Sequence, residues 1–330
     1  MMAPDADAGK SAGHRSDPFA PLATKLLPVG DGHEIHVETV GRIDGIAAVY
    51  LHGGPGSGCQ PDHRRLFDPE RFHAVLFDQR GARRSRPKGL REANTLPHLI
   101  ADMEMIREEF GLERWMVVGG SWGATLALAY SQAHPRRVSG IVLRATFLGT
   151  RAELEGAFLD CLPRIYPGLH EDFLSLLSDD ERARPLDAYW RRILDADPAV
   201  HGPAARAWQG TEGILSEHAP GRTRLDLNSL TSTRALPATP FMEAHYFAQG
   251  CFMQPGQLIA NADRLKDIPG IVVQGRYDLL CPPSTSHALK AAWPKAEIRI
   301  VEGAGHSLYD PGIRDAVMKA IADLASIVTA

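Results

Sequence analysis

Two patterns of apolar residues alternate along most of the chain. Short apolar runs typical of buried strands lie at residues 35–40, 46–53, 72–78, 115–120 and 138–145. Between these runs, residues 96–111 and 122–135 carry apolar side chains at helical spacing, and the patterns end at a glycine and a proline. This alternation predicts an α/β fold with a mostly parallel sheet that is flanked by helices.

The alternation stops in the middle of the chain and then resumes. From about residue 147 to 255 strand-like runs are scarce, and stretches such as PLDAYWRRILDADP indicate helices. Strand and helix patterns return at residues 269–278, 284–292, 296–306 and 311–327. We therefore expect a core formed by residues 20–146 and 256–330, with residues 147–255 inserted into it as a helical cap.

Composition narrows the class of protein. The chain has 330 residues, of which 44% are hydrophobic, and a net charge of −4 with acids and bases interspersed. It lacks the basic stripe of a nucleic-acid-binding protein and the polybasic segment of a membrane-surface protein. The four cysteines form no CxxC pair, which argues against a zinc site and a disulfide framework.

Residues 1–19 are small and polar, and they lack the apolar stretch of a secretion signal. We interpret them as a disordered leader. The sequence also contains no window of eighteen consecutive apolar residues that could span a membrane. Together these features predict a cytoplasmic protein.

The sequence VVGGSWGATLAL holds the first candidate for chemistry. Its G-x-S-x-G motif, formed by Gly119, Ser121 and Gly123, follows a predicted strand and opens a predicted helix. This is the context of a nucleophile elbow, a sharp turn that needs small flanking residues and exposes a serine hydroxyl at the carboxyl edge of the sheet. The motif alone also fits an ordinary glycine-rich turn. The choice between a turn and a nucleophile elbow therefore depends on the other residues of the site.

A serine hydroxyl becomes a nucleophile only beside a base that a third group orients. In α/β hydrolases the chain order is serine, acid, histidine. Asp278 follows the strand-like run at 269–278, and His306 lies in a glycine-rich loop after the next run. Parallel strands would bring both to the same sheet edge as Ser121. A serine at the elbow, in place of a carboxylate, favours acyl transfer over epoxide or haloalkane hydrolysis.

A tetrahedral intermediate also needs hydrogen-bond donors for its oxyanion. The sequence LHGGPG follows the strand at 46–53, and its glycines let main-chain N–H groups approach a substrate closely. We assign the donors to the backbone N–H groups of Gly54 and Trp122, with Gly53 as the fallback. We expect His52 to hold this loop rather than to act as an acid or base. The proposed chemistry requires no metal and no organic cofactor.

Five segments of the chain, HGGPG, FDQRG, GGSWGATLALAY, QGRYDLLCP and GAGHS, resemble the proline iminopeptidases (prolyl aminopeptidases). These are serine peptidases with the α/β-hydrolase fold. The similarity extends over about residues 20 to 330 and is thin between 151 and 205. It implies a catalytic triad of Ser121, Asp278 and His306, the three residues already reached from motif order.

Two further segments, ARAWQGTEG and FMEAHYF, resemble the substrate-binding part of the same family. The resemblance implies that Glu212 and Glu243 bind the free amino end of a small peptide. An N-terminal prolyl group is a secondary ammonium with two N–H donors, so two carboxylates can accept one charge-assisted hydrogen bond each. An acylated N-terminus would leave buried carboxylates uncompensated and should be rejected.

Two positions depart from the family pattern. Thr211 replaces a tryptophan that would help shape the pocket around a pyrrolidine ring, and Arg83 replaces a glycine after the DQRG segment. These changes leave the triad intact and leave the preferred N-terminal residue open. The alternatives are an esterase or amidase with a repurposed cap pocket, and a non-catalytic binding module, which the retained triad disfavours. The sequence does not indicate an oligomeric state.

Overall fold

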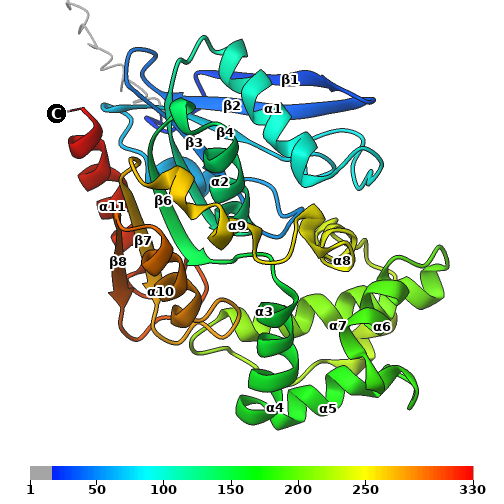
Figure 1. Ribbon diagram of the computed structural model, residues 1–330. Helices are drawn as coiled ribbons and strands as arrows, with labels where there is room; N and C mark the ends of the chain where they lie inside the picture. The colour runs from blue at the N-terminus through cyan, green and yellow to red at the C-terminus, as the bar shows by residue number, and fades with distance from the viewer. Residues whose placement is uncertain (1–16, 330) are drawn as a thin grey trace, which may run out of the picture.

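The computed structural model of the protein describes residues 17–329 (Figure 1). Its centre is an eight-stranded sheet with the order β1-β2-β4-β3-β5-β6-β7-β8. The strands are β1 (Ala23–Gly30), β2 (His33–Gly41), β3 (Ile46–Leu51), β4 (Phe72–Phe77), β5 (Trp115–Ser121), β6 (Val138–Thr146), β7 (Gly270–Gly275) and β8 (Ala296–Val301). From β4 to β8 every pairing is parallel, which confirms the mostly parallel sheet.

The two strands at the other edge are antiparallel, and the first of them was not predicted. β1 pairs with β2 and β2 pairs with β4, both in antiparallel register. β1 lies at the sheet edge with mostly exposed or half-buried side chains, so its sequence lacks the apolar run of an inner strand. The predicted leader of residues 1–19 lies outside the described residues up to position 16.

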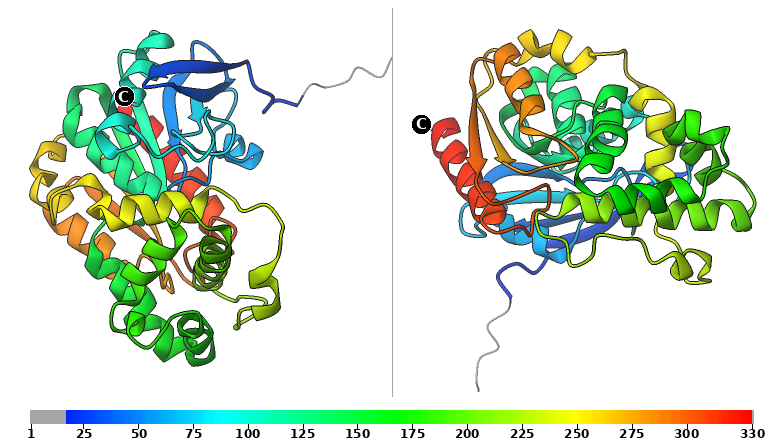
Figure 2. Two further views of the ribbon diagram at one scale, coloured as in Figure 1. Left: turned by 90° about the vertical axis from the view of Figure 1, so that its right-hand side faces the viewer. Right: turned by 90° about the horizontal axis from the view of Figure 1, so that it is seen from below.

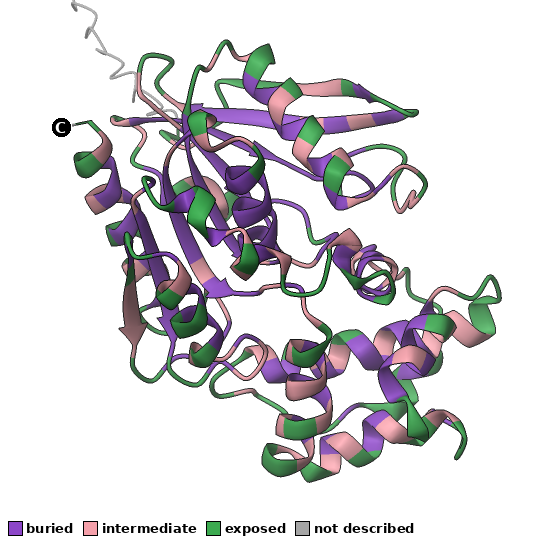
Figure 3. Ribbon diagram, in the orientation of Figure 1, coloured by how far each residue is buried: buried purple, intermediate pink, exposed green. Residues whose placement is uncertain are grey.

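Helices cover both faces of the sheet (Figures 1 and 2). The helices are α1 (Leu96–Glu109), α2 (Trp122–Ala133), α10 (Pro283–Ala292) and α11 (Ile313–Val328). In β5, Trp115 and Val117 belong to the core shared with α1 and α2, whereas Met116 and Val118 belong to the core shared with α11. Because both faces are buried, the inner strands read as continuous apolar runs (Figure 3).

The chain leaves the sheet after β6 and forms a helical segment before it returns at β7 (Figure 1). Residues 147–255, all of which the structure describes, contain helices and loops and no strand. The main elements are α3 (Arg151–Glu155), a π-helical turn η3 (Gly156–Cys161), α4 (Leu162–Ile165), α5 (Pro167–Ser175), α6 (Pro185–Ile193), α7 (Pro198–Ser216) and α8 (Thr239–Ala248). Aromatic stacking joins them, with ring centroids 4.4 Å apart for Phe158 and Trp208 and 4.1 Å apart for Phe173 and Tyr189.

Shorter turns complete the chain. They are the 3₁₀ helices η1 (Pro61–Leu66), η2 (Pro135–Arg137), η4 (Glu181–Ala183), η5 (Leu227–Thr231), η6 (Gly250–Phe252) and η7 (Ala262–Leu265), and the α-helical turn α9 (Gln257–Ala260). None of the helices in residues 17–329 combines the length and the apolar character that a membrane crossing needs. All four cysteines of the chain lie in the described part and are free thiols.

The turn between β5 and α2 is packed too tightly for any side chain at its flanking glycines. A Cβ on Gly119 would lie 2.2 Å from the carbonyl oxygen of Gly123, and a Cβ on Gly123 would lie 2.1 Å from the carbonyl oxygen of Leu51. Contacts this short cannot occur, so the turn needs glycine at both positions.

We predict that Gly123→Ala lowers the free energy of unfolding by about 2–3 kcal/mol, because the added methyl group must displace backbone atoms. Gly202→Ala in α7 is the matched control, since no described atom lies within 4 Å of a Cβ there. It should raise stability by about 0.5–1 kcal/mol through helix propensity. Denaturant unfolding followed by circular dichroism measures both, and an equal change in the two variants would refute the packing constraint.

Candidate active site

Ser121 lies at the last position of β5, where the chain turns into α2. Its backbone has φ 57° and ψ −123°, a conformation that a residue with a side chain adopts only under strain. Surrounding structure must hold such a turn in place, and the close contacts of Gly119 and Gly123 do so. The result is a serine at the carboxyl edge of the parallel strands, where a nucleophile elbow places it.

His306 and Asp278 are in direct contact. The Nδ1 atom of His306 lies 3.1 Å from Oδ1 and 3.0 Å from Oδ2 of Asp278. The buried Asp278 carboxylate also accepts hydrogen bonds from the backbone N–H groups of Leu280, at 3.0 Å, and Cys281, at 2.8 Å. The side chain of Arg144 donates to the carbonyl oxygen of His306. Further hydrogen bonds thus hold the Asp278 carboxylate and the backbone of His306.

One pocket brings the remaining candidates together. Its walls include Gly54, Ser121, Glu212, Glu243 and His306, and we call it the reactive pocket. Asp278 lies behind His306 and is buried. The Trp122 side chain is also buried, and its backbone N–H is the first of α2, where N–H groups have no acceptor within the helix.

The orientation of the 53–54 peptide follows from the hydrogen bonds of the Gly53 carbonyl. His52 Nε2 accepts the backbone N–H of Gln79 at 3.0 Å, and its Nδ1 lies 3.2 Å from the backbone nitrogen of Gly58 and 2.8 Å from the Gly53 oxygen. Ser57 Oγ donates to the same oxygen at 2.6 Å. Because N–H and C=O point in opposite directions in a trans peptide, the Gly54 N–H faces away from the loop interior.

Burial keeps His52 neutral, because desolvation lowers the pKa of its imidazole. Both of its ring nitrogens are engaged by the backbone of the loop and of Gln79. These contacts match the expectation that His52 holds the glycine-rich loop. They leave neither nitrogen available to a substrate.

Glu212 on α7 and Glu243 on α8 both line the reactive pocket. Glu243 is fully buried, and its Oε2 accepts the indole N–H of Trp208 at 2.7 Å. Its Oε1 has no hydrogen-bond partner among the residues that the structure describes. Burial, followed by the negative charge of Glu212, raises the pKa of Glu243 well above its ordinary value. Burial also raises the pKa of Glu212, although nearby His306 opposes that rise.

Burial of Glu243 and repulsion between the two adjacent carboxylates both favour a proton on Glu243. A bound cation that donates two hydrogen bonds would replace that proton. The unpartnered Oε1 of Glu243 is the kind of acceptor that such a cation would satisfy.

A second, apolar pocket adjoins Ser121 and Glu212. Its walls are Gly54, Ser121, Phe147, Leu154, Ala157, Phe158, Trp208, Glu212, Phe247, Leu280 and Cys281. We call it the aromatic pocket. Analysis of the sequence missed Phe147 and Phe158 as wall residues, because neither belongs to a recognisable motif. Trp208 and Phe247 do lie in the two segments that resemble the family's substrate-binding part.

The two departures from the family pattern have different structural settings. Thr211 is fully buried and lies outside the walls of both pockets, so it does not widen them directly. Arg83 is exposed and has a φ of 36°, within the region that favours glycine. This conformation explains why a glycine suits that position, and Arg83 adopts it at a cost in strain.

Comparison with known proteins agrees with the fold and the family that the sequence predicts. A family model described as the alpha/beta hydrolase fold matches residues 49–312. A proline iminopeptidase of Arabidopsis thaliana is 42% identical over 303 residues, which are 90% of this chain and 78% of that one. A proline iminopeptidase of Neisseria meningitidis is 40% identical over 308 residues, which are 92% of this chain and 96% of that one.

The chain belongs to the proline iminopeptidase family of α/β hydrolases.

Solved structures agree on the fold. A proline iminopeptidase of Mycobacterium smegmatis has a TM-score of 0.59 at 16% identity, and the match covers 92% of this chain and 99% of that one. A proline iminopeptidase-related protein of Thermus thermophilus has a TM-score of 0.58 at 23% identity, with 92% and 98% covered. The predicted fold and the predicted family are both confirmed.

The raised pKa of Glu243 has a consequence for stability. The unfolded chain releases this proton near the ordinary pKa of 4.5, whereas the folded protein keeps it to higher pH. The group therefore destabilises the folded state increasingly as pH rises from 4.5 toward the raised pKa.

We predict that Glu243→Gln stabilises the protein relative to the wild type by an amount that grows with pH, at most about 1.4 kcal/mol per pH unit. Denaturant unfolding at several pH values between 5 and 8 measures the difference. Glu171→Gln on the exposed side of α5 is the control, and its difference from the wild type should stay flat. A flat difference for Glu243→Gln as well would contradict the raised pKa.

Proposed function

We propose that this protein is a cytoplasmic serine exopeptidase that releases an N-terminal proline, or a similar small residue, from short peptides through an acyl-enzyme. The reactive pocket carries this proposal, because it unites a strained serine, an acid-paired histidine and two neighbouring carboxylates, of which that of Glu243 is fully buried. The names of the relatives support the same activity.

In the proposed mechanism, His306 takes the proton of Ser121 through Nε2 while the Ser121 oxygen attacks the carbonyl carbon next to the scissile bond. Asp278 holds the Nδ1–H of His306 and stabilises the imidazolium that forms. The N–H groups of Gly54 and Trp122 stabilise the tetrahedral oxyanion. The imidazolium then protonates the departing amine, and a water molecule that His306 activates hydrolyses the acyl-enzyme.

The specificity follows from charge. The secondary ammonium of an N-terminal proline supplies one positive charge and two N–H donors, which Glu212 and Glu243 can accept. The pair lies in the same pocket as Ser121, so it binds the end of a substrate one residue from the scissile bond. The aromatic pocket offers apolar walls for the pyrrolidine ring. We propose that the cap formed by residues 147–255 restricts the substrates to short peptides.

The role of Ser121 is tested by substitution. We expect Ser121→Ala to reduce the turnover of a prolyl arylamide by more than about 10⁴-fold, because no other group can form the acyl-enzyme. Ser131→Ala is the matched control, since Ser131 is a fully buried serine of α2. It should retain turnover. Circular dichroism checks that both variants are folded, and turnover that survives in Ser121→Ala would reject Ser121 as the nucleophile.

The carboxylate pair is tested by charge removal. We expect Glu212→Gln and Glu243→Gln each to raise KM for a prolyl arylamide by roughly 100-fold, because each leaves the buried ammonium with one charge-assisted partner fewer. N-acetylprolyl arylamide should be a poor substrate of the wild type, and Glu171→Gln should behave as the wild type does. If the wild type cleaves the acylated and free-amine substrates equally fast, the carboxylate pair does not select the substrate.

A further inference from the structure

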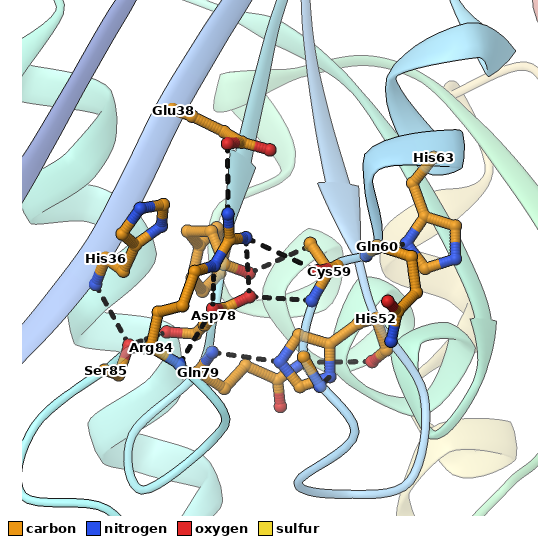
Figure 4. Close-up of polar contacts among 12 residues, drawn as sticks. His36, Glu38, His52, Cys59, Gln60, His63, Asp78, Gln79, Arg84 and Ser85 are labelled. Carbon is orange, nitrogen blue, oxygen red and sulfur yellow. Dashed lines mark hydrogen bonds and ion pairs between the residues drawn. The ribbon is translucent and has the colours of Figure 1, made fainter. Parts of the chain in front are cut away.

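The segment that follows β4 lies beside the glycine-rich loop and hydrogen-bonds to it, and the proposed mechanism does not use it (Figure 4). This segment, residues 78–85, begins with the DQRG sequence, and all of its hydrogen bonds to the loop come from three residues: Asp78, Gln79 and Arg84. The loop itself runs from His52 to Cys59 and contains Gly54, the proposed oxyanion donor.

Gln79 makes the central contacts. Its backbone N–H donates to Nε2 of His52, and its side-chain Nε2 donates to the carbonyl oxygen of His52, both at 3.0 Å. Its side-chain Oε1 accepts the indole N–H of Trp122 at 2.8 Å. One buried amide therefore joins the residue before Gly53 to the residue after Ser121.

Asp78 and Arg84 hold the far end of the loop, at Cys59 (Figure 4). Asp78 Oδ1 accepts the backbone N–H of Cys59 at 2.6 Å, and the Arg84 guanidinium donates to Asp78 Oδ2 at 2.7 Å. Arg84 also pairs with the buried carboxylate of Glu38 on β2 at 3.2 Å. Because this end is fixed to the sheet through charged groups, the bonds of Gln79 decide only the position of the near end, at His52.

The two proposed oxyanion donors lie directly beside the residues that Gln79 joins. The Gly54 N–H belongs to the peptide that follows Gly53, and the Trp122 N–H belongs to the residue whose indole Gln79 binds. These donors come from the ends of β3 and β5, and no other single side chain in the described residues hydrogen-bonds to both His52 and Trp122. We propose that Gln79 is a positioning residue that sets the separation of the two oxyanion donors.

This role rests on the proposed function, and it predicts which kinetic constants a substitution of Gln79 should change. An oxyanion hole binds the tetrahedral state and contributes little to binding of the ground state. A change in donor spacing should therefore lower kcat and weaken tetrahedral inhibitors, while it leaves binding of the substrate's amino end unchanged. A side chain that only stabilised the fold would not separate these quantities.

The test compares Gln79→Met with the wild type. We expect kcat for a prolyl arylamide to fall roughly 10- to 100-fold with KM changed less than about threefold. The affinity for a prolyl boronate, whose boron adds to Ser121 Oγ as a tetrahedral anion, should fall by the same factor as kcat. Inhibition by free prolinol, which presents only the amino end, should stay unchanged.

Gln132→Met is the matched control. Gln132 is also a buried glutamine, 4% exposed against 2% for Gln79, and its Nε2 donates to the carbonyl oxygen of Leu258 at 2.7 Å. Its loss should lower stability while kcat and boronate affinity stay at the wild-type level. An equal loss of kcat in the control, or a Gln79 variant with normal kcat, would overturn the proposal.

A second variant covers the case in which Gln79→Met does not fold. Trp122→Phe keeps the backbone N–H and removes only the indole donor, so it should show the same loss of kcat and boronate affinity. Combined with Gln79→Met in a folded protein, it should add little, because both variants break the same bridge. Fully additive losses would contradict a shared role.

The role of Gln79 can also be tested if the proposed peptidase activity is wrong. If the wild type does not cleave prolyl arylamides, the rate at which a fluorophosphonate labels Ser121 still reports on the oxyanion hole, because the phosphoryl oxygen occupies it. The Ser121 oxygen bonds to phosphorus and fluoride leaves, whatever the natural substrate is. Gln79→Met should slow this labelling about tenfold, and unchanged labelling would refute the positioning role.

Discussion

The site depends on the close approach of the β5–α2 turn to the end of β3. Gly123 lies so near the carbonyl oxygen of Leu51 that no side chain fits between them. β3 and β5 are neighbours in the sheet, so their two carboxyl ends meet there. One end carries Ser121 and the other leads into the loop that holds Gly54. The proposed nucleophile and one proposed oxyanion donor, from distant parts of the sequence, are thereby held near each other by one backbone contact.

The buried carboxylate of Glu243 introduces an energetic conflict that the fold tolerates. A carboxylate placed away from water is costly unless it is paired, and Glu243 has an acceptor atom without a partner among the described residues. In the proposed function, an ammonium supplies the counter-charge whose absence favours a proton on Glu243. This counter-charge is the proposed basis of specificity: the site is destabilised in the way that only a small cation with two donors corrects.

The sequence allowed prediction of those parts of the structure that depend on the local pattern of apolar and polar residues. The inner strands are buried on both faces and read as apolar runs, whereas β1 lies at an edge and gave no such signal. The contact between Asp278 and His306 was predicted because each follows a strand and parallel strands end together, whereas their roles as acid and base stay a proposal. The contacts of Gln79 could not be found, since its partners His52 and Trp122 lie 27 and 43 residues away in the chain. Phe158 reaches the aromatic pocket through a π-helical turn that no pattern in the sequence marks.

Recognition and catalysis are also linked through the backbone. The carbonyl oxygen of Ser216, at the end of α7, accepts the N–H groups of His306 at 3.1 Å and Ser307 at 2.9 Å. Glu212 lies one helical turn earlier on α7, so the helix that carries this proposed amine ligand also anchors the loop of the proposed base. Any displacement of α7 that moved Glu212 away from the pocket would therefore pull on His306. In the proposed function, α7 therefore links the binding of the substrate's amino group to the position of the His306 imidazole. This link runs through one helix and does not cross the sheet.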